Sequence, residues 1–289
     1  MDRPLSFYSF FQVFRLIRFQ NLLIIILTQY LAAIFLVGNE RSKLLTISEF
    51  NLFLIVCSTV FIAAAGYLIN DYYDVKIDML NKPEKVIVGY KLERRQVLIW
   101  HSVFNFSGIF LGTLVSIWIG VLNLFAASLL WLYSNRLKRL PLLGNLAVAL
   151  LTGLSLLVLA LYYRSNYLII LVYSSFAFGV TLIREIIKDM EDMRGDEAFG
   201  CKTLPIIFGI RKTKWFIYIL IFGIAVALYV FSIKVQSSGL STYFVLLLVP
   251  SLYLIFKLIR ADTKQLFNHL SQFCKWLMIG GILSMTLIK

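Results

Sequence analysis

The 289-residue sequence has few charged residues and few cysteines, and its central part has no acidic residue. Charged residues make up 15% and hydrophobic residues 60%, and the mean hydropathy is +0.84. An average soluble domain is about half apolar and a quarter charged. A soluble globular enzyme and a disordered protein are therefore excluded. Cys57, Cys201 and Cys274 lie far apart without a Cys-x-x-Cys pair, which excludes a disulfide framework and a zinc site.

Long apolar runs separated by polar breaks take up most of the chain. At about 20 residues per membrane span, they predict an all-α membrane protein with nine transmembrane helices in a single domain over residues 1–289. The runs do not alternate in polarity, which argues against a β-barrel. We expect the third and fourth spans to be joined by a short uncharged turn near Gly120. The predicted spans are 20–38, 48–70, 96–118, 121–135, 143–163, 166–188, 214–233, 241–260 and 271–288.

The 28 Lys and Arg residues are distributed unevenly between the predicted loops. Of these, 23 lie on one side of the nine-span topology, and the other five lie on the opposite side: Arg41, Lys43, Arg164, Lys234 and Lys289. Basic residues collect in cytoplasmic loops, so we expect a cytoplasmic N-terminus. The net charge of +13 is explained by the same bias, and we expect no nucleic-acid partner.

Acidic residues are concentrated in two short segments. None of the fifteen lies between Arg95 and Arg184, and eleven fall near the predicted ends of the second and sixth spans, both on the cytoplasmic side. We call residues 70–78 the first carboxylate segment and residues 189–196 the second. Both contain the spacing Asp-x-x-Asp-x-x-x-Asp, formed by Asp71, Asp74 and Asp78 and by Asp189, Asp192 and Asp196.

On a helix, residues at these spacings share one face, where like charges repel. A divalent cation between the segments would explain this arrangement. Oxygen ligands without nearby His or Cys favour Mg²⁺, which usually binds one or two carboxylates together with substrate phosphate oxygens. The segments therefore predict a diphosphate bridged by Mg²⁺ at the cytoplasmic side. The cations expected to bind the diphosphate are Lys82, Lys85, Arg136, Lys138, Arg139, Lys188, Arg194 and Lys202.

The motifs around both segments resemble the signatures of the UbiA superfamily of intramembrane prenyltransferases. This resemblance implies a nine-helix bundle around a central cavity, with cytoplasmic cap loops after the second and sixth helices. It also implies Mg²⁺-dependent transfer of a prenyl group from a prenyl diphosphate to an acceptor. The matching runs are Asn70-Asp71-x-x-Asp74-x-x-x-Asp78 with Asn81-Lys82-Pro83, Arg184-Glu185-Ile186-Ile187-Lys188-Asp189-x-x-Asp192-x-x-x-Asp196 with Lys202-Thr203-Leu204-Pro205, and Tyr133-Ser134 with Leu137-Lys138-Arg139.

The resemblance also implies roles for single residues. The residues expected to hold Mg²⁺–diphosphate are Asn70, Asp74, Asp192 and Asp196. Those expected to support this site or to activate the acceptor are Asp71, Asp78 and Asp189. We place Asn21 and Tyr67 at the cavity; a hydrogen bond between helices would explain Asn21 equally well. One departure concerns Lys85, which stands where many relatives have an arginine. Lysine is a point charge and cannot bind a diphosphate in the bidentate manner of arginine.

Two acceptor classes remain open. The runs 137–145 and 184–189 are most similar to the branch of the family that alkylates geranylgeranylglyceryl phosphate, so we expect a lipid-phosphate acceptor. The alternative is 4-hydroxybenzoate or another aromatic quinone precursor. A transporter would carry ionisable residues near the middle of its spans, whereas the predicted helix interiors have almost no acids. A CDP-alcohol phosphotransferase would need an Asp-Gly-x-x-Ala-Arg motif, which is missing.

Overall fold

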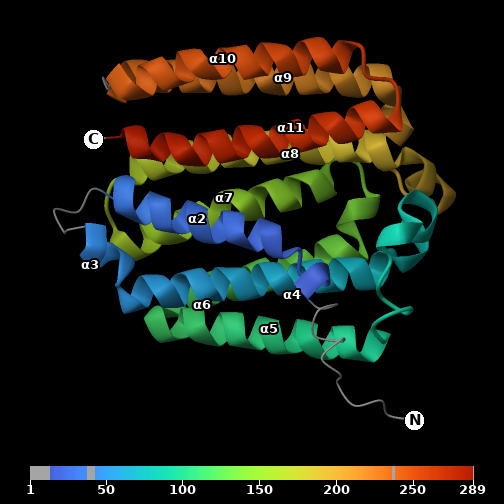
Figure 1. Ribbon diagram of the computed structural model, residues 1–289, viewed down its shortest axis with the longest axis horizontal. Helices are drawn as coiled ribbons and strands as arrows, with labels where there is room; N and C mark the ends of the chain where they lie inside the picture. Colours follow the sequence, from blue (N-terminus) through green and yellow to red (C-terminus); the bar gives the residue numbers. More distant parts are fainter. Residues whose placement is uncertain (1–13, 38–42, 236–237, 289) are drawn as a thin grey trace. The chain divides into compact units, whose positions relative to one another are not determined.

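The computed structural model describes residues 14–37, 43–235 and 238–288, and these ranges are helical, with one isolated bridge between Val88 and Leu92 and no strand. The helices are α2 (Phe19–Phe35), α3 (Lys43–Ile47), α4 (Phe50–Asn81), α5 (Arg94–Val115), α6 (Ile117–Asn135), α7 (Leu143–Tyr163), α8 (Tyr167–Ala198), α9 (Leu204–Val235), α10 (Ser238–Ile259) and α11 (Lys264–Ser284), with short 3-10 turns η1 (Pro83–Lys85), η2 (Leu137–Arg139) and η3 (Met285–Leu287) (Figure 1).

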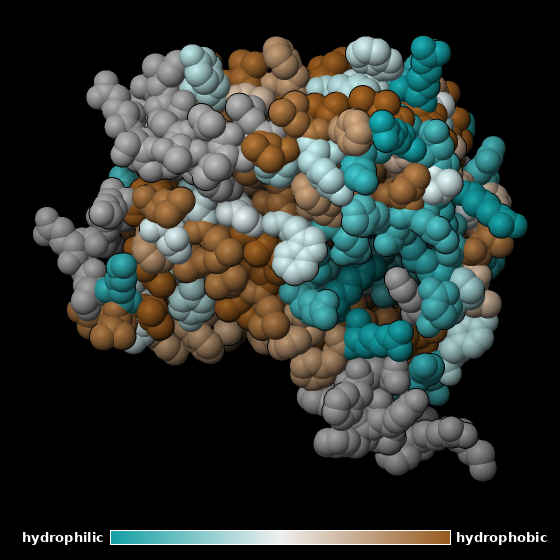
Figure 2. Space-filling model, turned by 45° about the horizontal axis from the view of Figure 1, so that its top comes forward, coloured by the Kyte–Doolittle hydropathy of each residue, from teal (hydrophilic) through white to brown (hydrophobic). Residues whose placement is uncertain are grey.

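Seven helices within the described ranges are long and apolar enough to cross a membrane: α4 to α9 and α11. Two shorter apolar helices, Phe19–Phe35 and Val249–Ile259, fall on the first and eighth predicted spans. Many large hydrophobic side chains point outward; Phe106 is 73% exposed and Phe222 71%. Broad hydrophobic areas of the surface are visible in Figure 2. Such a surface is expected of helices that face lipid rather than water.

The chain divides into two compact units. The first consists of Met1–Tyr30 and Ser42–Leu137. In it, α4 packs against α5 and α6. A hydrophobic cluster contains Ala64, Leu68 and Val97 together with Leu16, Ile17 and Leu22. A Cβ atom at Gly108 of α5 would lie 2.9 Å from the backbone oxygen of Ser58. Glycine therefore lets the backbones of α4 and α5 approach closely, as is common between membrane helices.

The second unit consists of Leu31–Arg41 and Lys138–Lys289. Here α8 is the central helix, in contact with α7, α9 and α11, while α10 packs on α9 and α11. Figure 1 shows α8 beside α11 and α9 beside α10. Ile186, Ile187, Phe267 and Cys274 are almost fully buried in the core of this unit. The amide of Asn166 donates to the backbone oxygens of Leu36 and Val37 at 3.1 and 3.0 Å.

The predicted turn between the third and fourth spans was misplaced. Helix α5 ends at Val115 and α6 starts at Ile117, so the break is at Ser116 and Gly120 lies inside α6. Ser116 has an extended backbone, and its hydroxyl accepts a hydrogen bond from the N–H of Trp118 at 3.3 Å. A serine in this position is a favourable helix N-cap. The prediction relied on Gly120 as the turn residue, but the helix break is at Ser116, four residues earlier.

Two helices continue well past the ends predicted for the second and sixth spans, near residues 70 and 188. Helices α4 and α8 both have 32 residues and end at Asn81 and Ala198. At 1.5 Å per residue each is about 48 Å long, whereas the hydrocarbon core of a bilayer is about 30 Å thick. Each helix is therefore long enough to extend beyond the membrane core. Both carboxylate segments lie in these C-terminal extensions and are helical.

Candidate active site

The first carboxylate segment occupies the last turns of α4. Asn70, Asp71, Asp74 and Asp78 are all half-buried, whereas the adjacent apolar residue Ile77 is buried. Because the segment is helical, these four side chains share a face about 100° wide, as the spacing predicted. About 10 Å of helix separates Asp71 from Asp78. The segment therefore offers a row of partly accessible carboxylates and not a buried ionic core.

Asp71 is held by a residue far away in the sequence. The guanidinium of Arg18, just before α2, donates to an Oδ of Asp71 at 2.9 Å. The same guanidinium lies over the ring of Tyr67, 5.0 Å from its centroid. Tyr67 is thus one helical turn from Asp71 and in contact with its ion-pair partner. The N–H of Asn21 donates to the backbone oxygen of Arg18 at 2.7 Å, which brings Asn21 close to this group.

The chain after α4 turns sharply. The N–H of Lys82 donates to the backbone oxygen of Asp78 at 2.7 Å, which ends the helix directly after the carboxylates. The 3-10 turn η1 follows at Pro83–Lys85. The side chain of Lys82 is half-buried. The side chain of Lys85 lies outside the described part of the structure, so its expected diphosphate contact stays a prediction.

The second carboxylate segment lies on the C-terminal part of α8. Asp189, Asp192 and Asp196 are half-buried and share a helix face, as their counterparts on α4 do. The side-chain amide of Asn145, in the first turn of α7, donates to Oδ2 of Asp189 at 2.9 Å. Asn145 is only 6% exposed. This hydrogen bond fixes one oxygen of Asp189 and links the segment to a neighbouring helix.

Two other acidic residues of α8 have a different environment. Glu185 and Glu191 are both buried, with 6% exposure each. Glu185 pairs with Arg184 at 2.6 Å and with Lys188 at 3.0 Å, and Glu191 accepts a hydrogen bond from the amide of Asn268 on α11 at 2.9 Å. These carboxylates are satisfied within the protein. Lys188, expected at the diphosphate, therefore also has a partner on its own helix.

The remaining expected cations lie in the connections between helices. Arg136 and Arg139 are exposed and Lys138 is half-buried, next to or within η2. On the C-terminal side of the second segment, Arg194 and Lys202 are exposed. The backbone N–H of Lys202 donates to the backbone oxygen of Arg139 at 2.8 Å. The structure thus brings the basic loop after α6 together with the connection between α8 and α9.

The donor set of the two segments suits Mg²⁺. Both segments supply only oxygen ligands, the type that hard cations prefer. Among the described residues, no group of three or more His, Cys, Asp or Glu side chains is close enough to hold a metal ion. Mg²⁺ commonly uses one or two carboxylates and completes its shell with water and phosphate oxygens. The residues therefore fit a cation that is bound together with its substrate.

Three residues that donate hydrogen bonds to carboxylates of the two segments were not predicted from the sequence: Arg18, Asn145 and Asn268. For Asn145 a signal was present, because an amide two residues inside an apolar run is costly to bury unless it is hydrogen-bonded. Arg18 directly precedes the first apolar run, where the positive-inside rule already explained it. Nothing in the sequence singles out Asn268.

The sequence matches the UbiA prenyltransferase family over residues 24–276. The digeranylgeranylglyceryl phosphate synthase of Thermococcus gammatolerans is 42% identical over 153 residues, which are 53% of this chain and 55% of that protein. The enzyme of the same name from Methanosphaera stadtmanae is 41% identical over 155 residues, 53% of this chain and 56% of that protein. The matched region thus spans about half the length of these curated relatives.

Solved structures share the fold along nearly the whole chain. A structure described as giving insights into digeranylgeranylglyceryl phosphate synthase in membranes has a TM-score of 0.73 at 22% identity, covering 96% of this chain and 97% of that chain. A UbiA homolog from Archaeoglobus fulgidus bound to DMAPP and Mg²⁺ has a TM-score of 0.68 at 16% identity, covering 95% and 99%.

These similarities agree with the architecture described above. The family match covers most of the chain, and the fold is shared with these solved structures over 95–96% of it. Seven helices of membrane-spanning length and composition make the protein an integral, multi-pass membrane protein. The chain belongs to the UbiA prenyltransferase family.

Proposed function

We propose that this protein transfers a prenyl group from a prenyl diphosphate to a glyceryl phosphate acceptor within the membrane, using Mg²⁺. The observation that carries the proposal is the pair of carboxylate segments, with one aspartate spacing, on the C-terminal turns of α4 and α8. The acceptor class is supported by the name of the curated relatives, digeranylgeranylglyceryl phosphate synthase. Donor and metal are supported by family members solved with DMAPP or GPP and Mg²⁺.

We assign the metal and diphosphate contacts to residues of both segments. The proposed Mg²⁺ ligands are Asn70, Asp74, Asp192 and Asp196. The proposed diphosphate contacts are Lys82, Lys85, Arg136, Lys138, Arg139, Lys188, Arg194 and Lys202. When bound, Mg²⁺ would neutralise the charge that develops on the leaving diphosphate. The basic side chains would stabilise the same charge through hydrogen bonds that strengthen as the bond breaks.

The reaction would break the C–O bond between the allylic carbon and the diphosphate, whose oxygen keeps the electron pair. A hydroxyl oxygen of the acceptor would then bond to that carbon and lose its proton. Asp189 is the best candidate to accept the proton, because a neutral amide, Asn145, holds it. Burial raises the pKa of Asp71, but its ion pair with Arg18 opposes this rise, so we expect Asp71 to be a weaker base than Asp189. We place Asp71 and Asp78 in supporting roles.

We further propose that the two units work as one domain with nine spans. The shorter apolar helices Phe19–Phe35 and Val249–Ile259 would add the first and eighth spans to the seven long ones. The positive-inside rule would then place the N-terminus and both carboxylate segments on the cytoplasmic side. The connections after α4 and α8 would act as cap loops over a central cavity containing Tyr67 and Asn21, with the prenyl chain surrounded by apolar helices.

A product assay tests this proposal. Purified protein in lipid discs would be supplied with geranylgeranyl diphosphate and an equimolar mixture of geranylgeranylglyceryl phosphate and 4-hydroxybenzoate, with Mg²⁺ or with a chelator. Mass spectrometry of the lipid extract identifies the product. A Mg²⁺-dependent ether lipid phosphate is the expected result. A prenylated benzoate would overturn the acceptor assignment. Binding of the diphosphate with no product from any acceptor would overturn the proposal that the protein transfers a prenyl group.

A further inference from the structure

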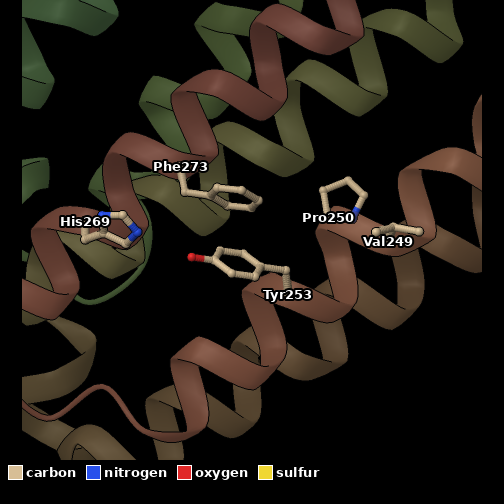
Figure 3. Close-up of a pocket in the computed structure, with 5 residues that line it drawn as sticks. All are labelled: Val249, Pro250, Tyr253, His269 and Phe273. Carbon is tan, nitrogen blue, oxygen red and sulfur yellow. The ribbon is translucent and has the colours of Figure 1, made fainter.

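A shallow cleft lies between α10 and α11, on residues that the proposed reaction does not use. It has a volume of about 380 Å³ and is lined by Val249, Pro250, Tyr253, His269 and Phe273 (Figure 3). The rings of Tyr253 and Phe273 point toward one another from the two helices, with centroids 4.8 Å apart. Val249 is 67% exposed, so the cleft opens onto the lipid-facing surface.

The cleft is mainly apolar, and its few polar groups lie toward one end. His269 lies near the start of α11, close in sequence to the turn that joins the two helices, and the hydroxyl of Tyr253 points toward its side (Figure 3). Val249, Pro250 and Phe273 lie farther from the turn and are apolar. An occupant that matches this gradient has a polar head and a hydrocarbon chain.

Two cations extend the polar end toward the turn. The ammonium of Lys257, one helical turn after Tyr253, lies 5.6 Å from the centroid of its ring. The guanidinium of Arg260 lies 4.4 Å from the ring centroid of Phe256. Both residues are exposed. Within the described ranges, the electrostatic contacts found for their charged groups are with aromatic rings and not with carboxylates.

The part of the chain that contains α9, α10 and α11 has almost no acidic residue to neutralise these cations, and the nearby Glu191 of α8 already accepts a hydrogen bond from Asn268. After Glu197 the sequence has ten Lys and Arg residues but a single acidic residue, Asp262. Asp262 pairs with Lys214 at 3.0 Å, which leaves it less able to offset Lys257 and Arg260. The polar end of the cleft is therefore electropositive and complementary to an anionic head group.

The dimensions fit a lipid of the bilayer. Val249 and Lys257 are eight residues apart on α10, which corresponds to about 12 Å along the helix axis. One leaflet contributes about 15 Å to the hydrocarbon core. We propose that this cleft binds an anionic phospholipid of the surrounding membrane, with an acyl chain along Val249, Pro250 and Phe273 and its phosphate at Lys257 and Arg260. This proposal does not depend on the proposed prenyl transfer.

Native mass spectrometry of the full-length protein tests the proposal with two probes of equal chain length, phosphatidylglycerol and phosphatidylcholine. The wild type is expected to bind one phosphatidylglycerol more tightly than any phosphatidylcholine. Because each cation near a membrane surface contributes a factor of about 5 in affinity, K257A/R260A is expected to weaken this binding at least tenfold. Val249→Trp, at an exposed position, is expected to fill the apolar end and weaken the binding of both lipids.

A matched control separates this site from general attraction to a basic protein. R211A/K212A removes the same charge from two exposed residues of α9 and should retain the preference for phosphatidylglycerol. Equal loss in both double variants, or unchanged binding in K257A/R260A, would overturn the proposal. A protein dimer that is stable without lipid and is broken by Val249→Trp would also overturn it, because the cleft would then belong to a second copy.

Discussion

Replacing Asn145 by leucine removes one hydrogen bond while keeping a side chain of similar size. In the native protein the amide of Asn145 donates to Oδ2 of Asp189 at 2.9 Å, and the residue is 6% exposed. Leucine cannot donate, so Asp189 loses the contact that orients it. Asn145 touches neither donor nor acceptor in our proposal and acts only through Asp189. It is a positioning residue.

The expected effect on activity is larger than the effect on stability. A hydrogen bond to a charged group contributes about 1.5–3 kcal/mol, and about 1.4 kcal/mol corresponds to a factor of ten in rate. We therefore expect kcat to fall about 10- to 100-fold, with a smaller change in KM for the prenyl diphosphate. Hydrogen bonds between membrane helices contribute about 0.6 kcal/mol to stability on average, and about 1.7 kcal/mol at most. The variant should stay folded.

The assay measures steady-state product formation in lipid discs together with thermal unfolding of the same samples. Asn123→Leu is the matched control. Asn123 is 5% exposed, and its amide donates to a backbone oxygen, that of Gly108, at 3.0 Å. It lies on α6, outside both carboxylate segments. This variant should lose a similar amount of stability and keep its kcat.

Two results would refute this reasoning. In the first, Asn145→Leu and Asn123→Leu lose activity to the same extent, which would mean that packing alone explains the change. In the second, Asn145→Leu keeps more than half of the wild-type kcat while its stability falls. The hydrogen bond would then be structural, and Asp189 would need no orienting partner.

Further predictions concern the other parts of the site. Asp74→Ala and Asp192→Ala should each abolish turnover without unfolding the protein, as measured by product formation and by gel filtration; activity in both would exclude the proposed metal ligands. Arg18→Ala should lower kcat about tenfold, because the hydrogen bond between Arg18 and the charged Asp71 is lost. Arg18→Lys should recover part of this loss. An unchanged kcat in Arg18→Ala would mean that Asp71 does not contribute to catalysis. Arg164→Ala should leave kcat within about twofold, since we place it on the opposite side of the membrane; a loss as severe as that of Asp74→Ala would contradict the topology.

The helical architecture could be predicted because long apolar runs have few alternatives in a membrane. Seven of the predicted spans match helices of sufficient length, and the separation of α5 from α6 was confirmed. The ends of α4 and α8 could not be placed, because the apolar run ends near residues 70 and 188 while each helix continues through the charged residues that follow. Residue spacing was the better guide there, since Asp71, Asp74 and Asp78 repeat with a helical period.

The partners of the carboxylates were beyond the reach of the sequence. Arg18 and Asp71 are 53 residues apart, and Asn145 and Asp189 are 44 residues apart. Each pair forms only because a particular face of one helix packs beside another, which the pattern of apolar residues does not determine. For the same reason the buried Glu191 could not be told apart from its half-buried neighbour Asp192 by position alone.

The central claim is that both carboxylate segments bind one Mg²⁺–diphosphate. Equilibrium binding of a radiolabelled prenyl diphosphate, with and without Mg²⁺, tests it in the wild type, in Asp74→Ala, in Asp192→Ala and in the double variant. We predict that each single change removes most of the Mg²⁺-dependent affinity and that the double variant loses little more, because both act on the same ligand. Wild-type affinity in either single variant, or strictly additive losses, would contradict the claim.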